Sequence, residues 1–287
     1  MIFVKIIVLA ILQGACELLP VSSSAHVIIA EKLMGIDPTT PDMTLLLVML
    51  HTGTMLAVII YFWQSWKANY FESSETFWKV FRLVVVATFL TLVIGFVLKL
   101  LIEKVFLRHV ANAEMEMIFG NLGLISISLA AVGVLIIISG RKDTSTRTIE
   151  VGLRGRGAAW IGAVQGLCLP FRGFSRSGAT ISTGLLMSIS KREVEEFSFA
   201  LVVVLTPLAI LKEIYRLLKA HYLSSPQSSE LLHLFLPSII GMVASFLAGL
   251  LALKWLSSWL EGGRWKYFGY YCLVASAVAF LLHQIGF

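Results

Sequence analysis

The sequence predicts an all-α polytopic membrane protein, with six transmembrane helices and two re-entrant helical hairpins arranged as an inverted-topology repeat. Three observations predict this fold: the composition, a set of long apolar runs, and a polar phrase that occurs twice. Of the 287 residues, 57% are hydrophobic and only 14% are charged, whereas a soluble domain carries about 25% charged residues. The net charge of +6 is spread between the apolar runs. Without a clustered basic face, it does not indicate a nucleic-acid-binding protein.

Six apolar runs are long enough to cross a bilayer, which takes roughly 20 residues. They lie at about 43–62, 77–102, 119–139, 197–218, 232–256 and 268–286. Two further apolar segments, about 2–29 and 158–188, are interrupted near the middle by Gly, Pro and several Ser. A straight helix would expose these groups to lipid, whereas a helix-loop-helix packed within protein would not. We therefore expect each interrupted segment to form a re-entrant hairpin.

The interrupted segments share a phrase, which reads QGAC at 13–16 and QGLC at 165–168, an offset of 152 residues. At the same offset Ser23 aligns with Ser175, and the later spans of the two halves align as well. Each half then holds one hairpin and three spans, so the halves enter the membrane from opposite sides. Such inverted repeats place their sites near the membrane midplane, at the interface of the repeats. We expect one integral membrane domain, 1–287, with repeat one at about 1–139, a cytoplasmic loop at 140–157 and repeat two at about 158–287.

The distribution of Lys and Arg predicts the orientation, since cytoplasmic loops carry an excess of both. The loop 140–157 is rich in Arg and Lys, so we place it in the cytoplasm. Loops 63–76 and 257–267 are then cytoplasmic too, and both termini are external. This orientation predicts a multi-pass protein whose active site opens to the external side.

The first hairpin carries a carboxylate, an imidazole, an amide and three hydroxyls: Gln13, Glu17, Ser22, Ser23, Ser24 and His26. Gln13 and Glu17 are four residues apart and share one face of a helix. A proline ends this helix, and Ser22 is placed to cap the next one. His26 follows Ser23 by three residues, so in a first helical turn the imidazole and the hydroxyl can meet.

The second hairpin carries two guanidinium groups and three hydroxyls: Arg172, Ser175, Arg176, Ser177 and Thr180. Arg provides a planar fork of donors that matches phosphate oxygens. Gly173 and Gly178 permit close approach of the backbone to a ligand. This pattern, inside an apolar segment, predicts a binding site for an oxyanion.

Together the two hairpins supply the parts that phosphoryl transfer needs: positive charge, a nucleophile and a group that handles protons. The carboxylate of Glu17 beside a phosphate favours a hard cation, Mg²⁺ or Ca²⁺. Glu17 would either bind this cation or act as a base. Two routes stay open: Ser23 activated by His26 is the nucleophile, or His26 positions an attacking water. In a purely structural interpretation, these serines only help to pack helices, and Glu17 forms a structural ion pair with Arg176. A transporter or flippase of a phosphate-bearing lipid or solute would use the same groups without chemistry.

With these motifs the chain resembles the bacterial undecaprenyl-diphosphate phosphatases of the bacitracin-resistance type. The first signature runs from Gln13 to His26 and reads QGACELLPVSSSAH, and the second runs from Gly173 to Ile181 and reads GFSRSGATI. The family pattern allows Glu or Gln at its first position, and this chain has Gln13, which leaves one carboxylate fewer for a metal. The sequence departs from the usual pattern with Ala25 in place of Gly and Arg172 in place of Pro.

The resemblance implies an enzyme of the bacterial plasma membrane that removes the terminal phosphate of undecaprenyl diphosphate. The product is the lipid monophosphate used in cell-wall synthesis, and the activity implies bacitracin resistance. It implies dependence on a divalent metal, with Glu17 as a ligand, and a homodimer is a possible assembly. The expected catalytic residues are Glu17, Ser23, His26 and Arg176. The expected substrate-binding residues are Gln13, Ser22, Ser24, Ser175, Ser177 and Thr180.

Overall fold

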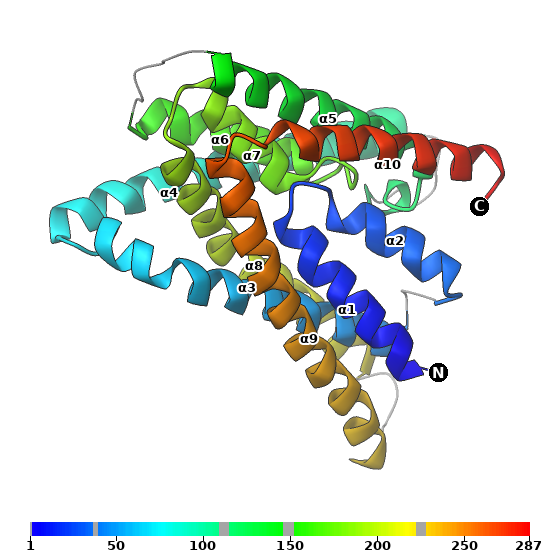
Figure 1. The fold of residues 1–287 in the computed structure, drawn as a ribbon. Helices are drawn as coiled ribbons and strands as arrows, with labels where there is room; N and C mark the ends of the chain where they lie inside the picture. The colour runs from blue at the N-terminus through cyan, green and yellow to red at the C-terminus, as the bar shows by residue number, and fades with distance from the viewer. Residues whose placement is uncertain (1, 37–39, 109–114, 146–151, 222–227) are drawn as a thin grey trace. The chain divides into compact units, whose positions relative to one another are not determined.

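A computed structural model describes residues 2–36, 40–108, 115–145, 152–221 and 228–287, and Figure 1 shows its helices in chain order. The described residues form ten α-helices and two short helical turns, without a β-strand among them. In chain order the α-helices are α1 (Ile2–Leu18), α2 (Ser23–Leu33), α3 (Pro41–Asn69), α4 (Ser74–Leu101), α5 (Leu122–Ser145), α6 (Gly155–Cys168), α7 (Arg176–Leu186), α8 (Lys191–His221), α9 (Ser228–Glu261) and α10 (Lys266–Gln284). A π-helical turn, Ile102–Phe106, and a 3-10 turn, Met115–Ile118, lie between α4 and α5.

Five helices are long and apolar enough to cross a membrane, and they confirm a multi-pass membrane protein. The spans are Met43–Asn69, Ser74–Val105, Leu122–Lys142, Lys191–Leu211 and Leu236–Glu261, and they match five of the six runs expected from the sequence. The sixth run, 268–286, corresponds to α10, which is not among the five. α10 has 19 residues, fewer than any of the five spans, and carries three tyrosines near its start.

Both interrupted segments form two helices joined by a break, as the sequence predicts. The helix pairs are α1 with α2 and α6 with α7, and the two members of each pair pack against each other. The halves correspond helix by helix, since α1 to α5 and α6 to α10 follow the same order with similar lengths. Part of the expected cytoplasmic loop 140–157, residues 146–151, lies outside the described residues.

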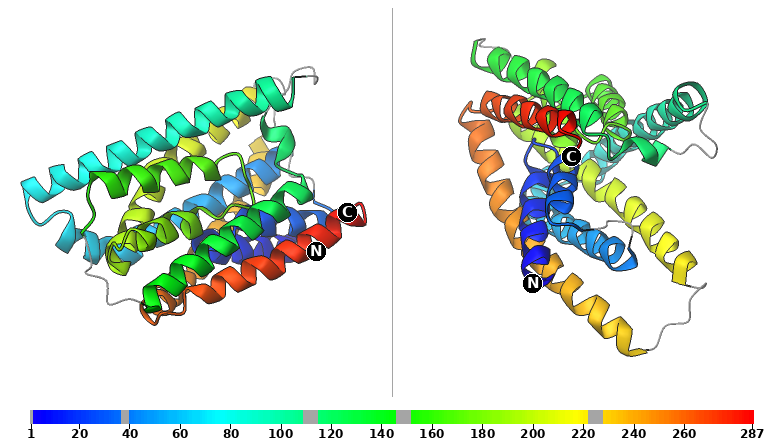
Figure 2. Two further views of the ribbon diagram at one scale, coloured as in Figure 1. Left: turned by 90° about the horizontal axis from the view of Figure 1, so that it is seen from above. Right: turned by 90° about the vertical axis from the view of Figure 1, so that its right-hand side faces the viewer.

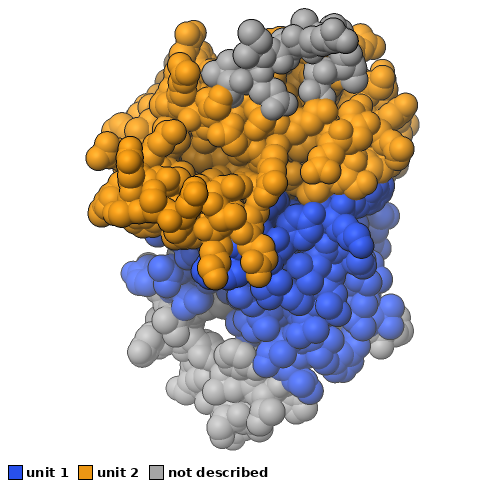
Figure 3. Space-filling view, turned by 60° about the vertical axis from the view of Figure 1, so that its left-hand side comes forward, with its two compact units in different colours: residues 1–19, 23–63, 202–256 blue, residues 20–22, 64–201, 257–287 orange. Residues whose placement is uncertain are grey.

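The chain divides into two compact units, coloured separately in Figure 3. The first unit holds residues 1–19, 23–63 and 202–256, and the second holds 20–22, 64–201 and 257–287. Each unit therefore draws on both halves of the sequence. In the first unit, side chains of α1, α2 and α3 form one apolar core, which includes Leu9, Val27 and Leu50. Lys5 of α1 donates a 2.6 Å hydrogen bond to the carbonyl of Met34, just after α2, which fixes the open end of this hairpin.

In the second unit, α5 and α10 lie side by side in antiparallel directions, as Figures 1 and 2 show. The hydroxyl of Ser126 donates to the carbonyl of Ser276 at 2.9 Å, and the hydroxyl of Ser276 donates to the carbonyl of Ser126 at 2.8 Å. Gly133 lies seven residues after Ser126 on α5, and Gly269 lies seven residues before Ser276 on α10. These two glycines are so close that a Cβ on Gly269 would stand 2.6 Å from the carbonyl oxygen of Gly133. The contacts between the two helices are therefore reciprocal.

The glycines of the repeated phrase make equivalent contacts in the two units. A Cβ on Gly14 would lie 2.5 Å from the carbonyl oxygen of Ser245 and 2.8 Å from the Cβ of Ala248, both on α9. A Cβ on Gly166 would lie 3.0 Å from the carbonyl oxygen of Thr91 and 2.8 Å from a side-chain carbon of Ile94, both on α4. In each unit, the first hairpin helix of one half therefore packs closely on the second long helix of the other half, which only Gly permits.

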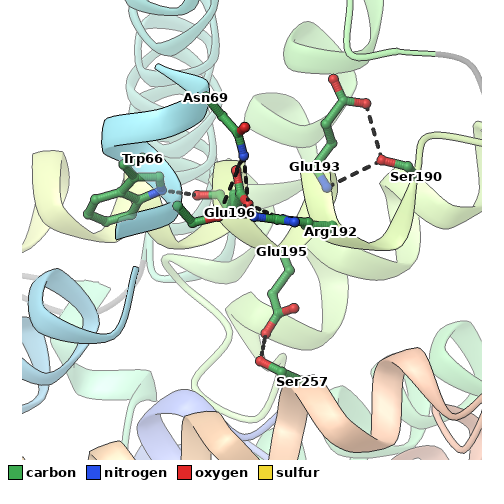
Figure 4. A network of polar contacts seen from close by, with 9 residues as sticks. Trp66, Asn69, Ser190, Arg192, Glu193, Glu195, Glu196 and Ser257 are labelled. Carbon is green, nitrogen blue, oxygen red and sulfur yellow. Dashed lines mark hydrogen bonds and ion pairs between the residues drawn. The ribbon is translucent and has the colours of Figure 1, made fainter. Parts of the chain in front are cut away.

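A polar network joins the end of α3 to the start of α8 in the second unit, as Figure 4 shows. The Glu196 carboxylate accepts hydrogen bonds from Ser65, from Asn69 at 3.0 and 3.2 Å, and from Arg192 at 2.8 Å. Trp66 donates to the main-chain carbonyl of Glu196 at 3.3 Å. Because a buried carboxylate is costly unless it is paired and hydrogen-bonded, these donors account for the burial of Glu196.

Candidate functional site

The break between α1 and α2 is a segment of four residues, 19–22, of which the last three, Pro20–Ser22, belong to the second unit. Pro20 lacks an N–H and cannot continue α1. Its carbonyl accepts a bond from the thiol of Cys272 at 3.3 Å. Ser22 has a φ of 68°, in the left-handed region that residues with a side chain rarely adopt. The Ser22 hydroxyl donates a 2.6 Å hydrogen bond to the carbonyl of Arg172, which helps to hold this conformation.

A carboxylate and a serine hydroxyl face each other across the first hairpin, within the first unit. Ser23, the first residue of α2, donates its hydroxyl to Oε2 of Glu17 on α1 at 2.5 Å. The side-chain amide of Gln13, one turn earlier on α1, donates to the same oxygen at 3.2 Å. The Glu17 side chain is 18% exposed, so the pair is neither buried away from a ligand nor open to bulk water. This arrangement is that of a nucleophile beside its base.

His51 of α3 completes this group of side chains. Its Nδ1 lies 2.8 Å from the carbonyl oxygen of Leu47, and its Nε2 lies 3.2 Å from Nε2 of Gln13. The carbonyl can only accept, so Nδ1 carries the proton in the neutral ring and Nε2 is the acceptor. The Gln13 amide then donates one hydrogen to His51 and the other to Glu17. His51 thereby fixes the orientation of Gln13.

Two further predicted residues lie on α2. Ser24 and His26 follow Ser23 in the first turn of the helix, and both are half-buried. His26 lies three residues after Ser23, so it is on the same side of α2. The hydroxyl of Ser23 donates to Glu17. The carboxylate of Glu17 is therefore one proton acceptor within reach of Ser23, which agrees with the role of base that the sequence leaves open for Glu17.

The second signature forms the start of α7, in the second unit. Ser175 is the N-cap, and its hydroxyl accepts the backbone N–H of Gly178 at 3.3 Å. Arg176 is the first residue of α7, and the first turn contains no acidic side chain. The hydroxyls of Ser175 and Ser177 are 3.4 Å apart, and both residues are buried. A helix N-terminus with a guanidinium and hydroxyls around it is suited to bind a phosphate.

Thr180 lies one turn further along α7 and is fully buried. Its hydroxyl donates to the carbonyl of Arg176 at 2.8 Å and lies 2.6 Å from the hydroxyl of Ser198 on α8. These bonds satisfy the hydroxyl within the protein. The placement favours a role in holding α7 against α8 over direct contact with a substrate.

Arg172, where the resemblance leads one to expect Pro, is exposed and lies before α7. Its guanidinium stands 4.1 Å above the centre of the Phe119 ring, which is a cation–π contact. The hydrogen bond from Ser22 is accepted by the main-chain carbonyl of Arg172 and does not involve the Arg172 side chain. The turn at residues 20–22 therefore depends on the backbone at this position, whatever side chain it carries.

The structure thus brings the predicted residues together in two groups. The first unit gathers Gln13, Glu17 and Ser23, with Ser24 and His26 on the same short helix. The second unit gathers Ser175, Arg176, Ser177 and Thr180 at the start of α7, and Ser22 beside Arg172. The sequence alone left open whether His51 lines the site or only packs helices. The available signal was a single imidazole inside an otherwise apolar span.

The residues around Glu17 can be compared with the needs of a divalent cation. The described part of the chain holds no group of three or more His, Cys, Asp or Glu side chains placed to bind a metal. The oxygens available beside Glu17 are those of Gln13 and Ser23. Mg²⁺ keeps several waters and is bound through one or two carboxylates plus phosphate oxygens. These residues therefore fit a cation that shares its ligands with water and substrate, and they do not fit a closed protein cage.

Comparison with known proteins gives consistent matches. The model of the family described as "Bacitracin resistance protein BacA" matches residues 6–278. The chain is 57% identical over 278 residues to Undecaprenyl-diphosphatase 2 of Acinetobacter baylyi, covering 96% of both chains. It is 30% identical over 281 residues to an undecaprenyl-diphosphatase of Rhodopirellula baltica, covering 98% of both. It is 29% identical over 286 residues to the same enzyme of Bdellovibrio bacteriovorus, covering 100% of this chain and 98% of the other.

Proposed function

Because the chain belongs to the bacitracin resistance protein BacA family, we propose that it removes the terminal phosphate of undecaprenyl diphosphate and releases the monophosphate. The names of its relatives, which are undecaprenyl-diphosphatases, support this substrate. The activity would return the lipid carrier to cell-wall synthesis and give resistance to bacitracin. The observation that carries the proposal is the 2.5 Å hydrogen bond from Ser23 to Glu17, which pairs a nucleophile with a proton acceptor.

In the mechanism that we favour, the Ser23 oxygen attacks the terminal phosphorus and its proton passes to Glu17. A bond forms between Oγ and phosphorus, the bridging P–O bond breaks, and the lipid monophosphate leaves. Water then hydrolyses the phosphoserine and releases inorganic phosphate. His26, on the same helix, is placed to transfer protons to the leaving oxygen or from the water. Gln13, held by His51, keeps the Glu17 carboxylate in position.

Arg176 is proposed to hold the diphosphate, together with the backbone N–H groups at the start of α7. A diphosphate carries several negative charges, which the carboxylate of Glu17 would repel. The guanidinium and the positive end of the α7 dipole offset this repulsion and stabilise charge that develops during transfer. We therefore propose that both groups of residues are needed for the reaction.

A divalent cation, Mg²⁺ or Ca²⁺, is proposed as the cofactor, with Glu17 as its protein ligand. A bound cation neutralises phosphate charge and polarises the phosphorus. Gln13 replaces a second carboxylate, so fewer protein charges hold the cation and more of its ligands come from substrate and water. This arrangement predicts weak binding of metal in the absence of substrate.

We propose that the halves form an inverted-topology repeat with re-entrant hairpins, that α10 is the sixth span, and that the site opens to the external side of the plasma membrane. The reciprocal bonds of Ser126 and Ser276 between antiparallel α5 and α10 support the inversion. Cysteine labelling of single-cysteine variants in intact cells tests the orientation. A cysteine in the loop 140–157 should react only after the membrane is permeabilised, and reaction from outside would overturn the proposed topology.

The proposed reaction is tested by identifying products by ³¹P NMR after the purified protein in detergent is incubated with undecaprenyl diphosphate. Equal amounts of lipid monophosphate and inorganic phosphate are expected. Release of pyrophosphate would show that the bond between the lipid and the diphosphate is cleaved, and this would contradict the proposed reaction. A transporter or flippase alone would leave the diphosphate intact, because detergent micelles provide no gradient and no second leaflet.

A further inference from the structure

The second unit contains an elongated groove between α5, α6 and α7, with a volume of about 450 Å³. Its lining residues on α6 are Arg156, Trp160, Val164 and Leu167, whose spacing places them on one face of the helix. At 1.5 Å per residue this face is about 16 Å long. The hydrocarbon core of a bilayer is about 30 Å thick, so the groove has roughly the depth of one leaflet. A single acyl chain of a phospholipid therefore matches it in length.

The interior of the groove is suited to a hydrocarbon chain. Leu135 of α5 and Val164 of α6 line it, and Leu186 and Met187 line it from the end of α7. Thr183 also lines it, but its hydroxyl donates to the carbonyl of Ala179 at 2.8 Å and is therefore satisfied within α7. Apolar surface of this kind gains free energy when a hydrocarbon covers it.

The groove is positively charged at the open end of the α6–α7 hairpin, where α6 begins and α7 ends. Arg156 lines the groove there and is exposed. Lys142 of α5 donates a 2.6 Å hydrogen bond to the main-chain carbonyl of Leu186, which also lines the groove. A Cβ on Gly157 would lie 2.8 Å from a side-chain carbon of Ile189, so the start of α6 lies beside the residues that follow α7. Both cations therefore lie at the same end of the groove.

One carboxylate also lies near this end, but it does not line the groove. The Glu193 oxygens each accept the backbone N–H of Leu153, just before α6, at 3.3 Å. Two more exposed arginines, Arg141 and Arg154, lie next to the groove residues in the sequence and add positive charge. The balance of charge at this end is thus positive, which is complementary to an anionic headgroup.

The same end has the features of a membrane surface. Trp160 is 53% exposed and lies one turn inward from Arg156. Trp rings are enriched where the bilayer meets water, and the stem of an Arg packs on apolar surface while its charge stays among headgroups. In the orientation proposed above this surface is the cytoplasmic one, whose leaflet carries anionic lipids. The other end, at Leu167 and Phe174, is then suited to the interior of the membrane.

We propose that this groove binds an anionic phospholipid, with one acyl chain along α6 and the phosphate beside Arg156 and Lys142. The ligand is not the substrate, because its headgroup lies at the end of α7 that is opposite to Arg176. The inference does not rest on the diphosphatase reaction. A lipid in this groove contacts α5, α6 and α7 together and so braces the hairpin that carries Arg176.

The test uses Trp160 as the reporter. The full-length protein is placed in nanodiscs of phosphatidylcholine that contain increasing fractions of phosphatidylglycerol with brominated acyl chains, which quench Trp fluorescence on contact. The quenching that is lost in Trp160→Phe is the signal from the groove. We expect this signal to saturate at a low fraction of brominated phosphatidylglycerol. Brominated phosphatidylcholine should quench it only in proportion to its fraction in the bilayer.

Arg156→Gln removes the charge and keeps a polar side chain at an exposed position. It should raise the fraction of phosphatidylglycerol needed for half-maximal quenching about fivefold, the effect of one cation near a membrane surface. The matched control is Arg82→Gln, which removes an exposed arginine of α4 outside the groove and should leave this fraction unchanged.

The acyl-chain part of the groove is tested by Val164→Phe, which narrows it. This variant should raise the half-maximal fraction about fivefold or more, because a filled groove must be deformed to admit the chain. Val274→Phe is its control, at a position of α10 that is 65% exposed and does not line the groove.

Three results would overturn the inference. Equal quenching by the two brominated lipids would show that the groove takes any bilayer lipid. An unchanged half-maximal fraction in Arg156→Gln would remove the headgroup from this end. Displacement of phosphatidylglycerol by an equal fraction of undecaprenyl diphosphate would assign the groove to the substrate.

Discussion

The hydroxyl of Ser22 donates a 2.6 Å hydrogen bond to the main-chain carbonyl of Arg172, 150 residues away in the sequence. Ser22 has a φ of 68° and directly precedes Ser23, whose hydroxyl donates to Glu17. The left-handed conformation at Ser22 sets the direction in which α2 begins. The bond to Arg172 therefore helps to position the proposed nucleophile.

Ser22→Ala should lower kcat about fivefold with little change in KM, because it removes a hydrogen bond worth about 1 kcal/mol and keeps the strained backbone. Ser22→Gly should be less impaired, since Gly adopts positive φ without steric cost. Arg172→Ala should keep near wild-type activity, because the carbonyl remains. Steady-state kinetics on the three purified variants checks this. Equal activity of Ser22→Ala and the wild type would show that the bond does not position Ser23.

Replacement of the proposed nucleophile or of its base should nearly abolish turnover. We expect Ser23→Ala and Glu17→Gln each to lower kcat at least about 100-fold, because each removes one partner of the transfer of the serine proton. The double variant should be little worse than either single one, since the two residues act as a unit.

The control for this experiment is Glu75→Gln, which removes an exposed carboxylate from the first turn of α4 and should leave turnover unchanged. Trapping with acid and mass spectrometry should detect phosphate on Ser23 in the wild-type protein. Substantial turnover by Ser23→Ala would favour direct attack by water positioned by His26.

Thr180 should prove important for stability more than for catalysis. Its hydroxyl lies 2.6 Å from that of Ser198, and both residues are fully buried. Thr180→Val keeps the shape but leaves the Ser198 hydroxyl without this partner, which costs about 1–3 kcal/mol. We expect a lower thermal midpoint in detergent and a kcat per folded molecule close to that of the wild type. A large loss of kcat at unchanged stability would assign Thr180 to the substrate instead.

Metal dependence follows from the single carboxylate in the group around Glu17. Treatment with EDTA should abolish phosphate release, and Mg²⁺ or Ca²⁺ should restore it. Because Gln13 occupies the position of a second carboxylate, Gln13→Glu should lower the cation concentration needed for half-maximal activity, by about tenfold for one added charge at short range. Full activity in the presence of EDTA would remove the cation from the proposal.

Local signals in the sequence were sufficient for several of these features. Pro20 and the Ser that follow it predicted the break between α1 and α2, and the offset between Gln13 and Gln165 predicted the matching pair α6 and α7. The apolar runs predicted six spans, and five of them are found among the described residues, because long apolar helices follow from composition alone.

Features that depend on distant partners could not be predicted in the same way. The bond of Ser22 to Arg172 and that of Thr180 to Ser198 arise from packing of separate helices. His51 lies 38 residues after Gln13 in the sequence, and the two side chains are in contact only because α3 packs on α1. Periodicity identifies which face of a helix is apolar, but it does not identify the helix that covers it. For the same reason, the hydrogen bond from Ser23 to Glu17 could be identified only from the structure.

The central claim is that the two signatures act together to dephosphorylate a polyprenyl diphosphate. The most direct measurement is the rate of phosphate release from undecaprenyl diphosphate by the purified wild-type protein, Glu17→Gln and Arg176→Ala, in detergent with Mg²⁺. We predict steady release by the wild type and a loss of about 100-fold or more in each variant, because one lacks the base and the other lacks the positive charge that stabilises the transferred phosphoryl group. Release by either variant at the wild-type rate, or no release by the wild type, would contradict the account.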